Sequence, residues 1–416
     1  MRVLSVRVRP RSTRWSRLRL SSVYSLAMRS GEAANGRIAP APRRRGRSDV
    51  SPSLRLRRIA LVAALVALTP VAFSYWRAMS QPSNTSLGVR TVEWLRDNGA
   101  AGLVARVESF YYTLTAPAKG GPTLAAVPKV GYAGGSPVQR PLASEAVPAA
   151  VAPMIHPGLP GEGVWHATRP SLSSEPPVLV TTVRDQPEYP RVVAGLAWID
   201  TNRTTLALNP GRLEPSVELP RGSMDVPTAE RPQLLATFNS GFKLSDSHGG
   251  FAVNGHTYAP MSDGQGTLVG YTNGRVDVLD WRYGARVPPG VAFARQNLPL
   301  IVEEGKPNPN IANDAEWGAT VGNAVLVWRS AIGVDRHGNL IYAAGGDQTV
   351  GSLANVLIHA GAIRAMELDI NSYWVTFISY GAPGAEDPNK LLEGMERPST
   401  RYLEPDDRDF FAVYSH

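Results

Sequence analysis

Residues 366–371 are the stretch whose residue types and spacing could most directly do chemistry. Apolar and polar side chains alternate strictly in Met-Glu-Leu-Asp-Ile-Asn, and a β-strand directs successive side chains to opposite faces. Glu367, Asp369 and Asn371 would therefore share one face. Two carboxylates and an amide in a row suit acid/base chemistry on a sugar or a phosphate. The alternative is a half-buried strand whose polar face contacts solvent.

Three further segments carry candidate site residues. Asn239 ends a predicted strand and Gly241 follows two residues later, so the amide and the next backbone N–H groups could bind an anion. Arg329 stands before another predicted strand, and its guanidinium could bind phosphate or carboxylate. Asp347 precedes a predicted helix and could serve as a catalytic carboxylate. A simple turn, a structural arginine and a helix cap are the respective alternatives.

The residue inventory leaves several chemistries without support. The chain has no cysteine, which excludes disulfides, thiolate metal sites and thiol catalysis. The glycine-rich turn at 263–266 lacks the Lys-Ser/Thr of a phosphate-binding loop. The histidines have no metal-ligand spacing, and neither a G-x-S-x-G nor an H-E-x-x-H motif occurs. We therefore predict no required cofactor, although acids and amides would also suit a divalent cation.

The net charge of +8 is unevenly distributed along the 416 residues. Sixteen of the 43 basic residues and two of the 35 acidic residues lie within 1–58, so that segment carries +14 and the remainder −6. We expect residues 1–58 to be a disordered, basic cytoplasmic tail. The mildly acidic remainder argues against nucleic acid as a partner.

Residues 59–76 form an uncharged, mostly apolar run preceded by arginines and ended by Tyr75 and Trp76. A helix of this length would reach about 27 Å, close to the hydrocarbon thickness of a bilayer. We predict a single-pass signal-anchor in the cell membrane, with the N-terminus cytoplasmic and everything after the anchor extracytoplasmic. A cleaved signal peptide is the alternative.

The remainder reads as a stalk, a linker and one α+β domain. We expect a helical juxtamembrane stalk at 77–114, broken at Asn98-Gly99, and a Pro-rich linker at 115–177. The domain at 178–416 would be a large, mostly antiparallel sheet system with few packed helices. Strands are predicted at 178–183, 192–200, 204–209, 233–239, 250–254, 267–272, 275–280, 324–328, 331–335, 339–344, 364–371 and 373–379, with a helix at 352–362.

Four of these segments, in this order, resemble the phosphodiester glycosidase family. They are Asn239-Ser240-Gly241-Phe242-Lys243, Arg329-Ser330-Ala331-Ile332-Gly333, the turn 346–351 before a helix, and Leu368-Asp369-Ile370-Asn371-Ser372. The resemblance covers roughly residues 230–380. The long stalk with its Trp-Leu-Arg-Asp-Asn-Gly stretch at 94–99 also resembles a membrane-anchored bacterial branch of this family. The sequence departs from the family where Leu-Asp is not followed by Gly-Gly-Gly-Ser, and where Ser240 and Lys243 replace the usual Gly and Phe.

The resemblance implies an extracytoplasmic hydrolase that cleaves a glycosidic bond in a sugar phosphodiester of the cell envelope. Asp369 and Glu367 would share the acid/base work, and Asp347 could replace either. The phosphate or the sugar hydroxyls would be held by Asn239, Gly241, Arg329 and Asn371. The alternative is a non-catalytic envelope protein that binds a glycan or another partner. Catalysis requires these residues, which are far apart in the chain, to converge on one pocket.

Overall fold

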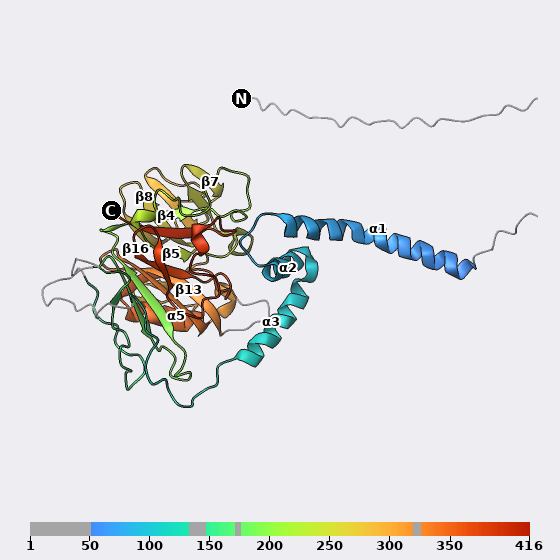
Figure 1. The fold of residues 1–416 in the computed structure, drawn as a ribbon. Coiled ribbons are helices and arrows are strands. Elements are labelled where there is room, and N and C mark those ends of the chain that lie inside the picture. Colours follow the sequence, from blue (N-terminus) through green and yellow to red (C-terminus); the bar gives the residue numbers. More distant parts are fainter. Residues whose placement is uncertain (1–50, 133–146, 171–175, 319–325) are drawn as a thin grey trace, which may run out of the picture. The chain divides into compact units, whose positions relative to one another are not determined.

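The computed structural model of the chain describes residues 51–132, 147–170, 176–318 and 326–416. Most of the predicted basic tail and parts of the predicted linker lie outside these ranges. The described chain divides into two units, one ending at Leu65 and the other running from Val66 to His416. All structure described below, except the first half of the helix α1, belongs to the second unit (Figure 1).

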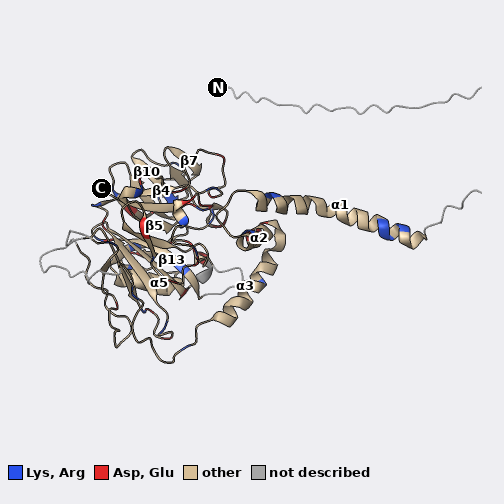
Figure 2. Cartoon of the chain, viewed as in Figure 1, with Lys and Arg blue, Asp and Glu red and all other residues tan. Residues whose placement is uncertain are grey.

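The helix α1 (Pro52–Ser80) contains the predicted apolar run. Among the described residues it is the one helix long and apolar enough to cross a membrane, and none of its apolar window is buried. Its basic residues lie near its two ends, with an uncharged stretch between them (Figure 2). These properties are compatible with a single-pass anchor or with a signal sequence.

The central layer of the domain is an eight-stranded sheet in which all neighbouring strands are antiparallel. In spatial order its strands are β1 (His166–Ala167), β2 (Val178–Val183), β3 (Ala194–Ile199), β14 (Leu340–Gln348), β13 (Val327–Asp335), β15 (Ala362–Glu367), β11 (Leu300–Glu303) and β12 (Lys306–Pro307). β13 contains residues 327–328 of the predicted strand at 324–328 and all of the predicted strand at 331–335, whereas residues 324 and 325 lie outside the described ranges.

Two smaller antiparallel sheets complete the domain. One contains β7 (His256–Ala259), β6 (Phe251–Val253), β10 (Val291–Gln296), β8 (Gly266–Tyr271) and β9 (Val276–Asp280). The other contains β17 (Glu386–Lys390), β16 (Phe377–Ala382), β5 (Leu234–Asn239), β18 (Phe410–Ser415) and β4 (Thr204–Asn209). The predicted α+β class, with a large antiparallel sheet system, few helices and an apolar N-terminal helix, is confirmed.

Both faces of the central sheet are buried, and β3 accordingly reads as a continuous apolar run. Along β14, Tyr342 packs into the core shared with the two smaller sheets, whereas Ile341 packs against α5 (Val350–His359). This helix begins at a capping box in which Thr349 and Ser352 each bond the other's backbone N–H. The other short helical segments are α4 (Leu244–Ser247) and the turns Arg231–Gln233, Asp314–Trp317 and Arg401–Leu403.

The predicted stalk is a helical hairpin that docks on the domain. It consists of α2 (Leu87–Leu95) and α3 (Ala101–Thr115), and the predicted break is confirmed because Gly99 has a φ of 89°. The preceding residues Ser83 and Thr85 donate hydrogen bonds to the carboxylate of Asp407. The start of the hairpin is thereby fixed to the segment before the last strand.

Part of the Pro-rich segment also packs on the domain. Val147, Val151 and Trp165 are buried in the cluster that includes α5, and the indole N–H of Trp165 donates to the carbonyl of Ala149. Burying such side chains contributes about 1.5–3 kcal/mol each. These residues therefore belong to the core of the domain.

Asp185, just after β2, makes the stability of this fold depend on pH. Its side chain is buried, and one oxygen accepts a hydrogen bond from Nε2 of Gln348 at 3.2 Å. Burial raises the pKa of Asp185 to about 6. The folded state therefore holds this proton more tightly than the unfolded state does, and stability is lost as the pH rises from about 4 to about 6.

We predict that Asp185→Asn, which keeps the acceptor for Gln348, raises the free energy of unfolding at pH 8 by up to about 3 kcal/mol. At pH 5 the gain should be smaller because the wild-type carboxyl is largely protonated there. Urea unfolding of the full chain at both pH values measures the difference. An equal effect of the substitution at pH 5 and pH 8 would contradict the assignment.

Candidate functional site

The site is built where the ends of β5 and β15 meet. After Glu367 the chain leaves the central sheet, and the backbone N–H of Asp369 donates to the carbonyl of Ser240 at 3.2 Å. The carbonyl of Asp369 accepts from both the N–H and the hydroxyl of Ser330, at 3.1 and 2.8 Å. The predicted strand at 364–371 therefore ends at Glu367, because the following residues bridge two sheets.

Asn239 stabilises this junction between the ends of β5 and β15 through buried hydrogen bonds. Its amide donates to the carbonyl of Ser240 and the hydroxyl of Ser330, and its oxygen accepts from the hydroxyl of Tyr342 and the N–H of Thr376. Two donated and two accepted bonds use the full capacity of an asparagine side chain. Asn239 is buried and does not line the pocket described below, so its amide holds the two strand ends in place.

Gly241, in the loop after β5, lies close to the side chain of Asn297. A Cβ at this position would stand 3.0 Å from Cγ of Asn297. Asn297 accepts from the N–H of Phe242 and donates to the carbonyl of Glu367, at 3.2 and 2.8 Å. A side chain at position 241 would press on Asn297, whose amide links the two loops. Gly241 also presents its carbonyl to Arg408 at 3.0 Å.

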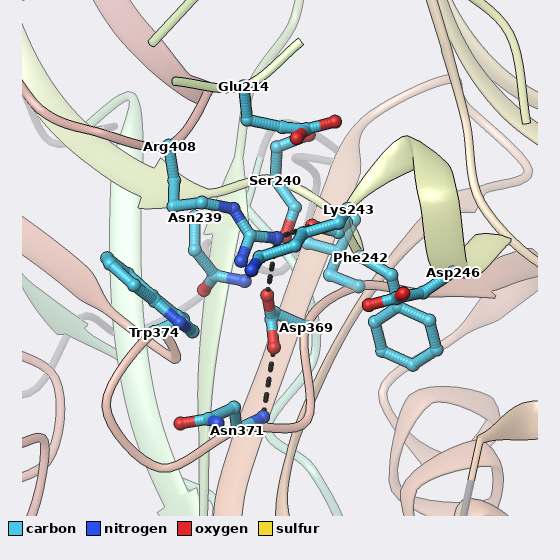
Figure 3. A network of polar contacts seen from close by, with 12 residues as sticks. Glu214, Asn239, Ser240, Phe242, Lys243, Asp246, Asp369, Asn371, Trp374 and Arg408 are labelled. Carbon is cyan, nitrogen blue, oxygen red and sulfur yellow. Dashed lines mark hydrogen bonds and ion pairs between the residues drawn. The ribbon is translucent and has the colours of Figure 1, made fainter. Parts of the chain in front are cut away.

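The carboxylate of Asp369 is the central group of the site (Figure 3). One oxygen accepts from the backbone N–H of Asn371 at 2.9 Å, and the other accepts from Nη2 of Arg408 at 3.0 Å. Only 5% of Asp369 is exposed. Burial raises the pKa of this carboxyl, and the positive charges of Arg408 and Arg401 oppose the shift.

Asp369 and Asn371 line a pocket of about 370 Å³. One wall is the helical hairpin and the other is the domain. The lining residues include Glu93, Arg96, Glu108, Tyr112, Phe242, Lys243, Asp246, Glu316, Gly318, Ile370, Trp374 and Arg408. Charges of opposite sign are paired around it, at 2.7 Å for Arg96 and Glu108, 3.6 Å for Lys243 and Glu93, and 3.0 Å for Arg408 and Asp369.

An aromatic ring surrounded by arginines forms another part of the pocket. The guanidinium groups of Arg397, Arg401 and Arg408 lie 5.1–5.4 Å from the ring centroid of Trp374. Arg397 and Arg401 are themselves paired with Asp406, at 3.1 and 2.9 Å. Cations over the face of an indole are attracted by its electron density. This buried cluster fixes Trp374 at the pocket.

Glu367 and Arg329 lie together, behind the pocket rather than in its lining. They form a fully buried ion pair of 2.6 Å between Nη1 and Oε1. Arg329 also donates to the carbonyls of Gln348 and Gly318, at 3.2 and 3.3 Å. Because Gly318 lines the pocket, this ion pair supports the loop that forms one of its edges. Glu367 pairs with Ala331 in the neighbouring strand β13, and both side chains lie on the face of the sheet that packs against α5.

Asp347 is not among the residues that line the pocket. Asp347 lies near the end of β14, and its backbone φ is 56°. Its carbonyl accepts a hydrogen bond from the side chain of Gln186 at 2.9 Å. Burial raises the pKa of its half-buried carboxyl. Of the seven predicted site residues, two therefore line the pocket, namely Asp369 and Asn371. Four support it from behind, namely Asn239, Gly241, Arg329 and Glu367, and Asp347 is apart from it.

Arg408 is a site residue that the sequence reasoning did not find. It is followed directly by Asp409 and the strand β18, and the run Asp406-Asp407-Arg408-Asp409 resembles a solvated surface segment. In the structure all four residues are buried. The sequence around this run carries no local signal that would have revealed its burial. Among the described residues, no group of three or more His, Asp or Glu side chains is placed to hold a metal ion.

Comparisons with known proteins concern the fold only. No family model and no curated protein matches the chain. One similar solved structure is the catalytic domain of zebrafish N-acetylglucosamine-1-phosphodiester alpha-N-acetylglucosaminidase, auto-inhibited by its pro-peptide. The match has 15% identity and a TM-score of 0.41, and covers 60% of this chain and 86% of that one.

A hypothetical protein from Synechocystis matches at 13% identity and a TM-score of 0.37. That match covers 61% of this chain and 65% of the other. At these identities the likeness is a distant relationship of folds.

We predict that Glu367→Gln destabilises the fold by about 3–5 kcal/mol, because it leaves the charge of Arg329 buried without its counter-ion. Thermal unfolding of the full chain measures this loss. Glu386→Gln is the matched control, since Glu386 is exposed and should change stability little. Wild-type stability of Glu367→Gln would contradict the structural role of the ion pair.

Proposed function

We propose that this chain is a membrane-anchored, extracytoplasmic hydrolase that cleaves a glycosidic bond in a sugar phosphodiester of the cell envelope. The observation that carries the proposal is the buried Asp369, whose pKa is raised in a pocket beside Arg408 and Trp374. A carboxyl group with a raised pKa suits proton donation to a leaving oxygen. The four sequence segments that resemble phosphodiester glycosidases add to this support.

The proposed chemistry assigns the proton to Asp369. In the proposed hydrolysis, a water molecule attacks the anomeric carbon as the glycosidic bond breaks, and its surplus proton passes to solvent. Asp369 would donate its own proton to the leaving phosphate oxygen and become a carboxylate that Arg408 stabilises at 3.0 Å. Trp374 would offer an apolar wall to a sugar ring, and Asn371 would bond a hydroxyl. Lys243 and Arg408 would bind the phosphate. No step is assigned to Glu367 or Asp347, because neither lines the pocket.

The proposed location follows from α1 and the charges around it. Arg55, Arg57 and Arg58 precede its apolar run, and such arginines favour the cytoplasmic side. The pocket would then face the extracytoplasmic space, where envelope glycans are the partners. The proposal requires no cofactor. Acidic residues line the pocket, and the activity measured with and without a chelator tests whether a divalent cation takes part.

We predict that Asp369→Asn abolishes hydrolysis of a sugar-1-phosphodiester, because an amide cannot donate the proton. The fall should be at least 100-fold, the scale of general acid catalysis. Release of the free sugar by the full chain in detergent measures it. Asp387→Asn is the matched control, because Asp387 is exposed and outside the pocket. Undiminished turnover by a folded Asp369→Asn variant would refute the assignment.

We predict that the rate falls as the pH rises through the pKa of Asp369, because only the protonated carboxyl can donate. Arg408 stabilises the charged form, so Arg408→Gln should raise that pKa further and move the alkaline limb to higher pH. The pH profile of residual activity measures the shift, whatever the loss in rate. A limb that stays in place or moves to lower pH would exclude Asp369 as the proton donor.

A second function, glycan binding without catalysis, is favoured by two observations. Arg96, Lys243 and Arg408 are each already paired with an acid, so a phosphate would have to compete for them. The loop after Asp369 also lacks the glycines usual in the family. Retention of the protein on an immobilised envelope glycan, with every phosphodiester left intact, would select this function.

A further inference from the structure

The helix α3 carries an apolar face that no described part of the protein covers. Leu103, Val107, Phe110 and Leu114 are each more than 60% exposed. They recur at intervals of three and four residues and therefore form one stripe along the helix. Tyr111 adjoins the stripe and is exposed to a similar degree. Monomeric soluble proteins rarely leave such a row of large apolar side chains in water.

The opposite face of α3 is occupied by the domain. Val104 is buried, Glu108 pairs with Arg96 at 2.7 Å, and both Glu108 and Tyr112 line the pocket. The docking of α3 therefore fixes its rotation about its own axis. Because of this docking, the apolar stripe points away from the pocket and does not pack into the hydrophobic core.

The hairpin is in direct contact with the end of α1. The indole of Trp94 in α2 donates to the hydroxyl of Ser74 at 3.1 Å, and its ring meets that of Tyr75 edge-on at 5.2 Å. Arg90 donates to the carbonyl of Ala78. Figure 1 shows α2 and α3 beside this end of α1. Tyr75 stands at the end of the apolar run, where aromatic rings occupy the membrane interface.

We propose that the apolar stripe of α3 binds the surface of a lipid bilayer. Phe110 on the stripe, Tyr111 beside it and the exposed Arg106 at its edge have the composition of helices that lie in the interface, with a cation for anionic headgroups. Only five residues separate α2 from α3, so α3 begins close to the contact between α2 and Tyr75. The same hairpin lines the pocket, so the pocket is held close to the lipid. This inference rests on the proposed anchor.

The absence of native cysteine allows a direct test on the full chain. Phe110→Cys and Leu114→Cys place a spin label on the stripe, and Thr113→Cys places one on an exposed polar position of the same helix. Each variant is reconstituted into vesicles of phosphatidylcholine and phosphatidylglycerol. Accessibility of the label to oxygen and to a water-soluble nickel chelate is then compared, after thermal unfolding has shown that each variant is folded.

We expect labels at 110 and 114 to be more accessible to oxygen than to nickel, and the label at 113 to show the reverse. Vesicles that retain the protein while labels at 110 and 114 stay open to nickel would overturn the inference and leave the anchor standing. Protein that does not float with the vesicles would overturn the anchor itself. Spin–spin coupling at 110 or 114 would show that a second copy covers the stripe, which also overturns the inference.

Discussion

The ion pair between Asp369 and Arg408 connects three parts of the chain that the sequence keeps far apart. Asp369 follows β15, Arg408 precedes β18, and the same guanidinium reaches the carbonyl of Gly241 after β5. An uncompensated charge at this depth would cost several kcal/mol, so each partner depends on the other. The pocket exists because these loops are held together, and its acidity is set by the balance between burial and the arginine charge.

The segment between α1 and the helical hairpin is built into the same network. Ser83 and Thr85 bond Asp407, which is adjacent to the pair of Asp406 and Arg401. The hairpin then contributes Glu93 and its neighbours to the pocket wall. In this arrangement the segment expected to be a simple stalk completes the site. Movements of the hairpin and the chemistry of the pocket would therefore be coupled through the ion pair of Lys243 and Glu93.

The fold class was predictable because alternating apolar and polar residues, bounded by turn residues, indicate short strands directly. The strands β2 and β4 begin and end at the predicted residues, and α5 lies within three residues of its predicted bounds. The burial of Glu367 was not predictable, since alternation assigns it a face but not what covers that face. Only tertiary structure shows that Arg329 and α5 occupy it. Asp369 is also buried but lines the pocket, because β15 ends at Glu367 and the chain then leaves the sheet.

The same limit explains Arg408. Charged residues are usually exposed, and a run of four charges before a strand carries no local sign that it will be buried. The pairs that bury it involve Asp369, some 40 residues away, and Gly241, more than 160 residues away. Contacts of such separation leave no periodic pattern in one sequence, whereas strands and turns do.

The most direct test of the account is a structure of the chain bound to a glycosyl phosphonate, in which carbon replaces the scissile oxygen. We expect the sugar against Trp374, the phosphonate beside Arg408 and Lys243, and the carboxyl of Asp369 within hydrogen-bond distance of the replaced atom. A ligand bound elsewhere, with Asp369 and Arg408 unchanged, would contradict the assignment of this pocket as the substrate site.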